Sequence, residues 1–182
     1  MPNIDWNASD YQKHFSFVPS YGESVMELLT KPEGAFVVDL GCGNGMLTKK
    51  LAEKGYHVLG VDDSETMLRL AEKNCSGISF QKGNAVDFSL KQKADAIFSN
   101  AVLHWIDAKD QQKMLDNICH QLVLGGEFVW RLWLCGAGAQ HAGKMFCSPR
   151  YDLSACVLFS DDWNICPDVG AGRISGRICK PF

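Results

Sequence analysis

Long apolar runs are missing from this sequence of 182 residues. No stretch approaches the about 18 consecutive apolar residues that cross a bilayer, and the first residues lack the basic and apolar regions of a secretory signal. Hydrophobic residues still make up 46% of the chain and charged residues 21%, which is typical of a globular domain and excludes a disordered protein. The sequence therefore predicts a cytoplasmic chain with one main domain and no membrane segment.

Metal-binding cysteine pairs and an excess of positive charge are also missing. The eight cysteines form no C-x-x-C pair, and the residues around His141 and Cys147 lack zinc-site spacing. We therefore expect reduced thiols and no metal site. The net charge of −3 argues against a surface that binds nucleic-acid phosphates. A small molecule is the expected partner, rather than nucleic acid or a membrane, and the sequence leaves the oligomeric state open.

Strands and helices are expected to alternate along the first 134 residues. Short apolar runs predict strands at residues 35–40, 56–61, 78–81, 94–99 and 127–134. Helical spacing, with caps at Ser20, Ser64 and Asp107, predicts helices at residues 20–30, 46–54, 64–74 and 107–122. This alternation predicts an α/β fold, a three-layer, doubly wound and mainly parallel sheet whose ligand site lies at the carboxyl ends of the strands.

The last part of the chain has a different character. Five of the eight cysteines follow residue 132, and no glutamate follows Glu127. Apart from a candidate strand at residues 155–159, neither a helical nor an alternating period is present. We therefore expect a domain at residues 1–134 and a divergent segment at residues 135–182, in which the last strands of the sheet are divergent or incomplete.

A glycine-rich loop follows the first expected strand. Asp39 is followed by Gly41, Gly43 and Gly45, and glycine allows both positive φ and close approach of a ligand to the backbone. Asp62 stands 19 positions beyond Gly43, at the end of the second strand, where a carboxylate binds ribose hydroxyls. A tight turn without ligand and a helix-capping role for Asp62 are the structural alternatives. As ligand sites, both a dinucleotide site and an S-adenosylmethionine site fit these residues.

Two motifs resemble the class I S-adenosylmethionine-dependent methyltransferases. They are Val-Val-Asp-Leu-Gly-Cys-Gly-Asn-Gly at residues 37–45 and Val-Leu-Gly-Val-Asp at residues 58–62. A dinucleotide dehydrogenase would place its third glycine one position later. The resemblance continues at residues 83–85, 95–105 and 124–128 and covers about residues 6–130. Together with the N-terminal aromatic residues, the fourth-strand segment is similar to the trans-aconitate methyltransferase branch.

The resemblance implies a Rossmann-like methyltransferase fold and a role for each matching residue. The cofactor-binding residues it implies are Asp39, Gly41, Gly43, Gly45, Asp62, Asp63, Met67, Asn84, Ala85, Asn100 and Ala101. Among them, Asp62 is expected at the ribose and Asn84 at the adenine amino group. The expected acceptor pocket contains Tyr11, Phe17, His104 and Trp105. The catalytic residues are left unknown, with His104 and His14 as the nominated bases and plain packing as the alternative for each aromatic residue and histidine.

The expected activity is transfer of a methyl group from S-adenosylmethionine to a small-molecule acceptor such as a carboxylate. A carboxylate is nucleophilic without a base, whereas an amine, phenol or carbon acid must lose a proton. A polycarboxylate calls for basic pocket residues, and Arg69 and Arg131 are the only arginines before residue 132. The alternatives are a catalytically impaired or inactive cofactor-binding domain with a truncated C-terminus, and an NAD-dependent oxidoreductase.

Overall fold

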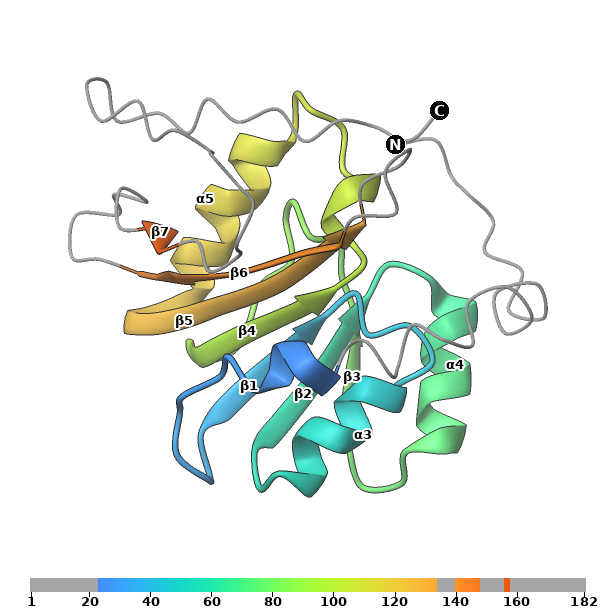
Figure 1. Ribbon diagram of the computed structural model, residues 1–182. Coiled ribbons are helices and arrows are strands. Elements are labelled where there is room, and N and C mark those ends of the chain that lie inside the picture. The colour runs from blue at the N-terminus through green and yellow to red at the C-terminus, as the bar shows by residue number, and fades with distance from the viewer. Residues whose placement is uncertain (1–22, 134–139, 148–155, 158–182) are drawn as a thin grey trace, which may run out of the picture.

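The computed structural model describes residues 23–133, 140–147 and 156–157. They form one sheet of seven strands in the order β3-β2-β1-β4-β5-β6-β7, flanked by helices (Figure 1). The element bounds are β1 Phe36–Leu40, α3 Met46–Glu53, β2 His57–Asp62, α4 Glu65–Asn74, β3 Ser79–Lys82, β4 Ala94–Asn100, the 3₁₀ helix η1 Leu103–Trp105, α5 Gln111–Gln121, β5 Leu122–Trp133, β6 Gln140–Phe146 and β7 Cys156–Val157.

The first five strands are parallel. β1 pairs with β2 on one side and with β4 on the other, while β3 and β5 extend the sheet outward. The chain therefore starts at the centre, runs out to β3 and returns across β1 to β4. Strand order reverses between β1 and β4, and such sheets bind ligands outside the carboxyl ends of the strands at this point. The expected α/β fold is confirmed.

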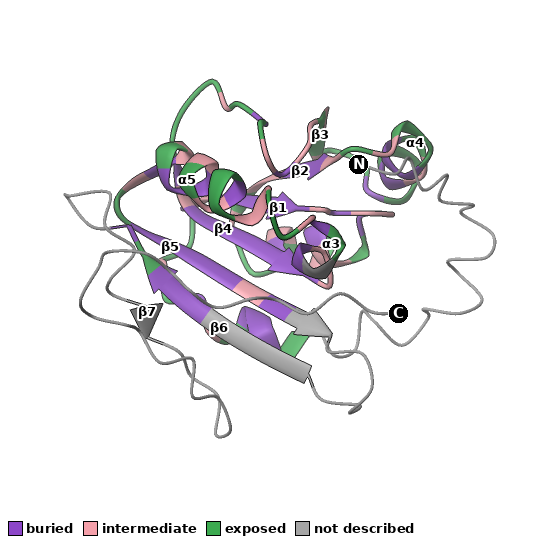
Figure 2. Ribbon diagram, turned by 90° about the horizontal axis from the view of Figure 1, so that it is seen from above, coloured by how far each residue is buried: buried purple, intermediate pink, exposed green. Residues whose placement is uncertain are grey.

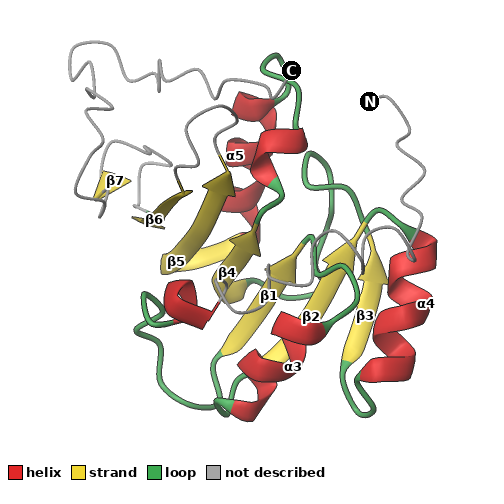
Figure 3. Cartoon of the chain, turned by 45° about the vertical axis from the view of Figure 1, so that its right-hand side comes forward, coloured by secondary structure: helices red, strands yellow, loops and turns green. Residues whose placement is uncertain are grey.

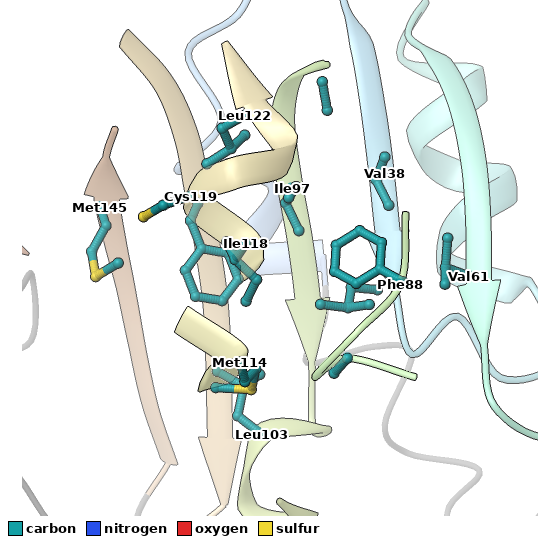
Figure 4. Close-up of a cluster of buried hydrophobic side chains, with 14 of the residues drawn as sticks. Val38, Val61, Phe88, Ile97, Leu103, Met114, Ile118, Cys119, Leu122 and Met145 are labelled. Carbon is teal, nitrogen blue, oxygen red and sulfur yellow. The ribbon is translucent and has the colours of Figure 1, made fainter. Parts of the chain in front are cut away.

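Helices cover both faces of the sheet (Figure 3). One buried cluster joins Leu51 of α3 and the helical residues 23–26 to β1, β4 and β5. The other joins Met114 and Ile118 of α5 to the opposite face and reaches Met145 of β6 (Figure 4). Successive side chains of a strand point to opposite faces of the sheet, so β4 contributes to both clusters. Phe98 packs in the cluster with Leu51, and Ile97 packs in the cluster with Met114 and Ile118. Buried residues accordingly follow one another along β4 (Figure 2).

Several expected boundaries differ from the structure. The helix expected at residues 107–122 begins at Gln111, because Asp107 starts a turn in which its carbonyl accepts the Asp110 amide at 2.8 Å. The strand expected from residue 127 begins at Leu122, and its register is irregular opposite Ala94 and Ala96. The helix expected at residues 20–30 is helical at residues 23–26 and has ended by Thr30, while its expected cap lies outside the described residues.

Two antiparallel strands extend the sheet beyond residue 134. β6 pairs with β5 along its whole length, and β7 pairs with β6 through two residues. β7 falls within the strand expected at residues 155–159, whereas the sequence pattern does not predict β6. The division of the chain at residue 134 stays a prediction.

A buried polar cluster fastens β6 to the sheet. The Lys144 ammonium lies 3.0 Å from Oε1 of Glu127, and the two side chains are 6% and 3% exposed. Thr30 donates its amide to Oε2 of Glu127 at 3.0 Å and its hydroxyl to Oε1. Burial opposes the charge of Glu127, but the bonds from Thr30 and Lys144 outweigh it, so the pKa of Glu127 lies below its usual value. We call this group the Glu127 cluster. No helix in the described part of the chain has the length and apolarity to cross a membrane.

Candidate functional site

The predicted site residues gather at the carboxyl ends of the parallel strands. Asp39 lies at the end of β1, Asp62 ends β2, Asn84 follows β3 and Asn100 ends β4. The loop after β1 lies beside the switch point between β1 and β4 (Figure 1). The sheet therefore brings residues from widely separated parts of the sequence to one edge.

The loop after β1 has a left-handed backbone at all three predicted glycines. The φ angles of Gly41, Gly43 and Gly45 are 77°, 54° and 80°. A Cβ on Gly41 would collide with Val102, and one on Gly45 would lie 2.8 Å from Cys75 Sγ. A Cβ on Gly43 would meet nothing within 4 Å. Gly41 and Gly45 are therefore needed for packing as well as for φ, whereas Gly43 faces open space that a ligand can approach.

Asp62 links the glycine loop to the next helix. Its Oδ2 accepts the amide of Gly43 at 2.9 Å, and its Oδ1 accepts the amide of Ser64 at 2.8 Å. Burial raises the pKa of Asp62, and these amide bonds partly oppose that rise. The backbone amide of Asp63 also lowers the pKa of this carboxylate, and an ionised carboxylate has about four acceptor positions, so acceptor capacity is left for a further donor. The carboxylate thus orients the loop and keeps capacity to accept a hydrogen bond from a ligand.

Asp39 lies below the loop and is 2% exposed. The Thr48 hydroxyl of α3 donates to its Oδ2 at 2.6 Å. Burial raises the pKa of Asp39 to about 7; the bond from Thr48 lowers it, and the nearby Asp62 adds to the rise. Asp39 therefore joins β1 to α3 beneath the glycine loop. Burial likewise raises the pKa of the neighbouring Cys42 thiol, so this cysteine is an unreactive packing group.

Asp63 and Asn84 meet on the β3 side of the site. Asn84 Nδ2 donates to Oδ2 of Asp63 at 3.1 Å, and Gly83 donates its amide to the Asp62 carbonyl at 3.0 Å. The two other predicted residues of this region, Met67 and Ala85, are buried. The structure therefore brings all these predicted residues to the ends of β2 and β3.

The ends of β4 and β5 supply a second polar region. Asn100 and Arg131 are register partners, and each is 8% exposed. Asn100 Oδ1 is buried without a hydrogen-bond partner among the described residues. Arg131 donates from Nη2 to the Ser24 hydroxyl at 2.7 Å. Ala101 follows with a φ of 61°, a strained angle for a residue with a Cβ.

The predicted acceptor-pocket residues are only partly covered by the structure. Trp105 stands in η1, directly after β4, and its side chain is 40% exposed. His104 belongs to the same short helix, but its side chain lies outside what the structure describes. Tyr11, His14 and Phe17 fall in residues 1–22, outside the described ranges.

Four residues outside the predicted set of site residues also shape the site. Thr48 holds Asp39, Val102 occupies the space beside Gly41, and the Ser64 amide holds Asp62. In the sequence, Arg131 stands out only as one of few arginines, with nothing to place it in the site. A signal exists for Ser64, whose hydroxyl caps α4 as expected and accepts the Met67 amide at 3.4 Å. For the others, the partner is set by tertiary packing.

Comparison with known proteins identifies the family of this chain. Residues 37–126 match the family described as methyltransferase domain. An uncharacterized methyltransferase of Schizosaccharomyces pombe is 32% identical over 80% of this chain and 58% of its own length. A trans-aconitate 2-methyltransferase of an Acidovorax species is 31% identical over 83% of this chain and 67% of its own. The chain thus spans about three fifths to two thirds of the length of these relatives.

A solved structure has the same fold. A TehB-like S-adenosylmethionine-dependent methyltransferase of Corynebacterium glutamicum superposes with a TM-score of 0.60 at 22% identity, covering 72% of this chain and 75% of its own. The matches are to methyltransferases, so they favour the methyl donor over the dinucleotide as the nucleoside ligand. This chain belongs to the class I S-adenosylmethionine-dependent methyltransferases, and S-adenosylmethionine is the cofactor of its family.

Proposed function

We propose that this protein transfers a methyl group from S-adenosylmethionine to a small-molecule acceptor and that the acceptor atom is a carboxylate oxygen. The observation that carries the cofactor assignment is the Asp62 carboxylate, which fixes the open Gly43 loop and retains acceptor capacity for a ligand. A ribose presents adjacent hydroxyl donors, which a carboxylate at the end of the second strand accepts.

The described residues fit the rest of the cofactor as well. The space beside Gly43 admits the chain of atoms between the ribose and the amino-acid group. Asn100 Oδ1 is a buried acceptor that lacks a partner among the described residues, and such a group is costly unless a donor reaches it. The ammonium of the methionine part is a donor of this kind. Asp39 supports the loop from beneath through Thr48.

Methyl transfer requires alignment more than proton chemistry from the protein. The cofactor supplies a methyl group on a positively charged sulfur, which is already a good leaving group. The protein therefore needs no nucleophile of its own, and its task is to hold donor and acceptor in line and to exclude water. A carboxylate acceptor also needs no general base, and His104 and His14 would be required only for an acceptor that must lose a proton.

Two residues at the end of the site support a carboxylate acceptor. Arg131 is a buried guanidinium in register with Asn100, and guanidinium groups bind carboxylates through paired hydrogen bonds. Trp105 adds a partly exposed aromatic surface after β4. Tyr11 and Phe17 are proposed to complete the pocket. The names of several relatives, trans-aconitate 2-methyltransferases, point to the same acceptor class. The free thiols of the described cysteines are consistent with a cytoplasmic location.

Calorimetric titration tests the cofactor assignment. We expect the full chain to bind S-adenosylmethionine and S-adenosylhomocysteine but not NAD⁺. Asp62→Ala should weaken both adenosyl ligands by about 100-fold, because it removes two hydrogen bonds to a charged group. Glu72→Ala, which removes an exposed carboxylate from α4, is the control and should bind normally. Binding of NAD⁺ alone, or equal binding by both variants, would contradict the assignment.

A transfer assay tests the acceptor. With trans-aconitate as the probe, Arg131→Met should raise KM by about 10-fold to 100-fold, as expected when a hydrogen-bonded charge pair is lost. The affinity for S-adenosylhomocysteine should not change. Arg69→Met, on the exposed face of α4, should leave KM unchanged. If trans-aconitate and simpler carboxylic acids accept no methyl group from a protein that binds the cofactor, the carboxylate proposal fails.

A further inference from the structure

Arg131 and Asn100 lie on the face of the sheet that the helical residues 23–26 cover. Asn100 is two positions beyond Phe98 and therefore points to the same face. For the same reason, Arg131 shares the face of Val129. Phe98 and Val129 both belong to the buried cluster that contains the helical residues, which are blue in Figure 1. The two polar side chains are therefore register neighbours on one face, near the carboxyl ends of β4 and β5.

The guanidinium of Arg131 extends from the sheet to these helical residues. Its Nη2 donates to the Ser24 hydroxyl at 2.7 Å. Arg131 is 8% exposed, whereas Ser24 is exposed, so the bond holds the charged end of a buried side chain at the border with solvent. A serine hydroxyl is neutral, and it therefore orients the guanidinium without cancelling its charge.

The segment that carries Ser24 is held by contacts of its own. Glu23 pairs with Lys50 of α3, and residues 25–26 are buried against the sheet. A hydroxyl on a segment held in this way has a fixed position. It can therefore determine where a long side chain with many rotamers points. The arrangement suits a residue that positions the guanidinium.

We propose that Ser24 is a positioning residue for the methyl acceptor, because it holds the Arg131 guanidinium in the orientation that binds the acceptor carboxylate. This inference rests on the proposed function, in which Arg131 binds that carboxylate. A guanidinium binds a carboxylate best through two parallel hydrogen bonds, so the plane of the guanidinium must face the acceptor. Arginine has five N–H donors, and a bond from one of them to Ser24 is compatible with two to a carboxylate. Orienting the side chain before the acceptor arrives lowers the entropy cost of binding.

The experiment measures methyl transfer to trans-aconitate by the full chain. Ser24→Ala should raise KM for trans-aconitate by about 3-fold to 10-fold, the effect of one hydrogen bond, and should leave kcat within about two-fold. The affinity for S-adenosylhomocysteine should not change. Ser24→Thr retains the hydroxyl group and should keep KM close to that of the wild type. Ser76→Ala, which changes an exposed serine in the turn after α4, is the matched control and should keep the wild-type KM.

A double-mutant comparison tests whether Ser24 acts through Arg131. In an Arg131→Met protein, the added Ser24→Ala change should alter KM by less than about 1.5-fold, because the partner of the hydroxyl is already missing. An equal rise of KM in both backgrounds would contradict the inference. A parallel loss of affinity for S-adenosylhomocysteine in Ser24→Ala would contradict it too, because the change would then disturb the whole site.

The outcomes separate this inference from the function on which it rests. If the wild-type protein methylates no carboxylic acid, or if Arg131→Met leaves KM unchanged, the proposed acceptor contact itself fails, and the role of Ser24 fails with it. If Arg131→Met raises KM but Ser24→Ala does not, the acceptor contact stands and the inference about Ser24 is wrong. The comparison of Ser24→Ala with Ser24→Thr decides the matter even where Arg131→Met fails to fold.

Discussion

Within the described residues, the carboxylate of the Glu127 cluster and those of the candidate site lie in opposite electrostatic environments. In the Glu127 cluster, a cation and a threonine surround the carboxylate, and its pKa lies below the usual value. At the site edge, the buried Asp39 lies near the half-buried Asp62, and the pKa of each is raised. The first arrangement satisfies a charge within the protein. The candidate site instead keeps carboxylate oxygens that can accept hydrogen bonds. A ligand with hydrogen-bond donors and a positive charge can bind there.

The largest expected effect comes from breaking the satisfied cluster. Lys144→Met leaves the Glu127 carboxylate buried without its cation, which should lower the free energy of unfolding by about 3–5 kcal/mol. Urea denaturation measures this. Lys144→Met combined with Glu127→Gln should recover most of the loss, because the uncompensated charge is gone. A loss under about 1 kcal/mol in the single variant would show that the cluster is not a buried ion pair in solution.

The two regions should also lose their contributions to stability at opposite ends of the pH scale. The pKa of Asp39 in the folded protein, about 7, exceeds its ordinary value of 3.8, so the folded state retains a proton that the unfolded state releases. Stability from this group is complete below about pH 4, falls as the pH rises to about 7 and is lost above it. Asp39→Asn should remove this fall, which is on the order of 4 kcal/mol.

Glu127 has the reverse behaviour. Its pKa is lowered in the folded protein, so its contribution is present at neutral pH and is lost as the pH falls below the usual glutamate range. Urea titrations at about pH 4, 5.5, 7 and 8 compare wild type, Asp39→Asn and Lys144→Met. An Asp39→Asn protein whose stability still declines toward alkaline pH as steeply as wild type would exclude Asp39 as the cause.

A smaller effect distinguishes ligand binding from folding within the site. Gly43 and Gly34 both have positive φ and open space where a Cβ would stand, so an alanine at either should cost about 1 kcal/mol of stability. Only Gly43→Ala should also weaken S-adenosylhomocysteine, by about 10-fold or more. Thermal unfolding and calorimetry measure the two effects. Equal affinity of both variants would mean that the ligand does not approach Gly43.

The smallest expected effect concerns the strained residue after β4. Ala101→Gly relieves a left-handed conformation at φ 61° and should stabilise the protein by about 0.5–1 kcal/mol. Chemical denaturation checks the sign. A destabilised glycine variant would show that the alanine methyl group packs favourably enough to offset the strain.

The position of the glycine loop and of Asp62 is well predicted from the sequence, because the signals for them are local. After the first strand, three glycines within five residues predict the turn and the start of the next helix. An acid at the end of the second strand predicts the carboxylate that faces this turn. The β6 strand could not be predicted in this way. Lys144 is buried there through Glu127 and Thr30, so a charge that normally marks solvent exposure faces the interior. The position of Arg131 could not be predicted either, because it depends on register pairing with Asn100 of β4 and on a hydrogen bond to Ser24.

The direct pairing of β6 with β5 has a consequence for how the sheet is assembled. Trp133 pairs with Gln140 seven positions later, whereas Val37 of β1 pairs with Ala96 of β4 after closure of a loop of about 60 residues. Closing the short loop costs little entropy, so the hairpin can form before the parallel strands have found one another. The outer edge of β5 would then be paired with β6 early in folding. A second unfolded chain could not pair with that edge, and such pairing is how aggregation begins.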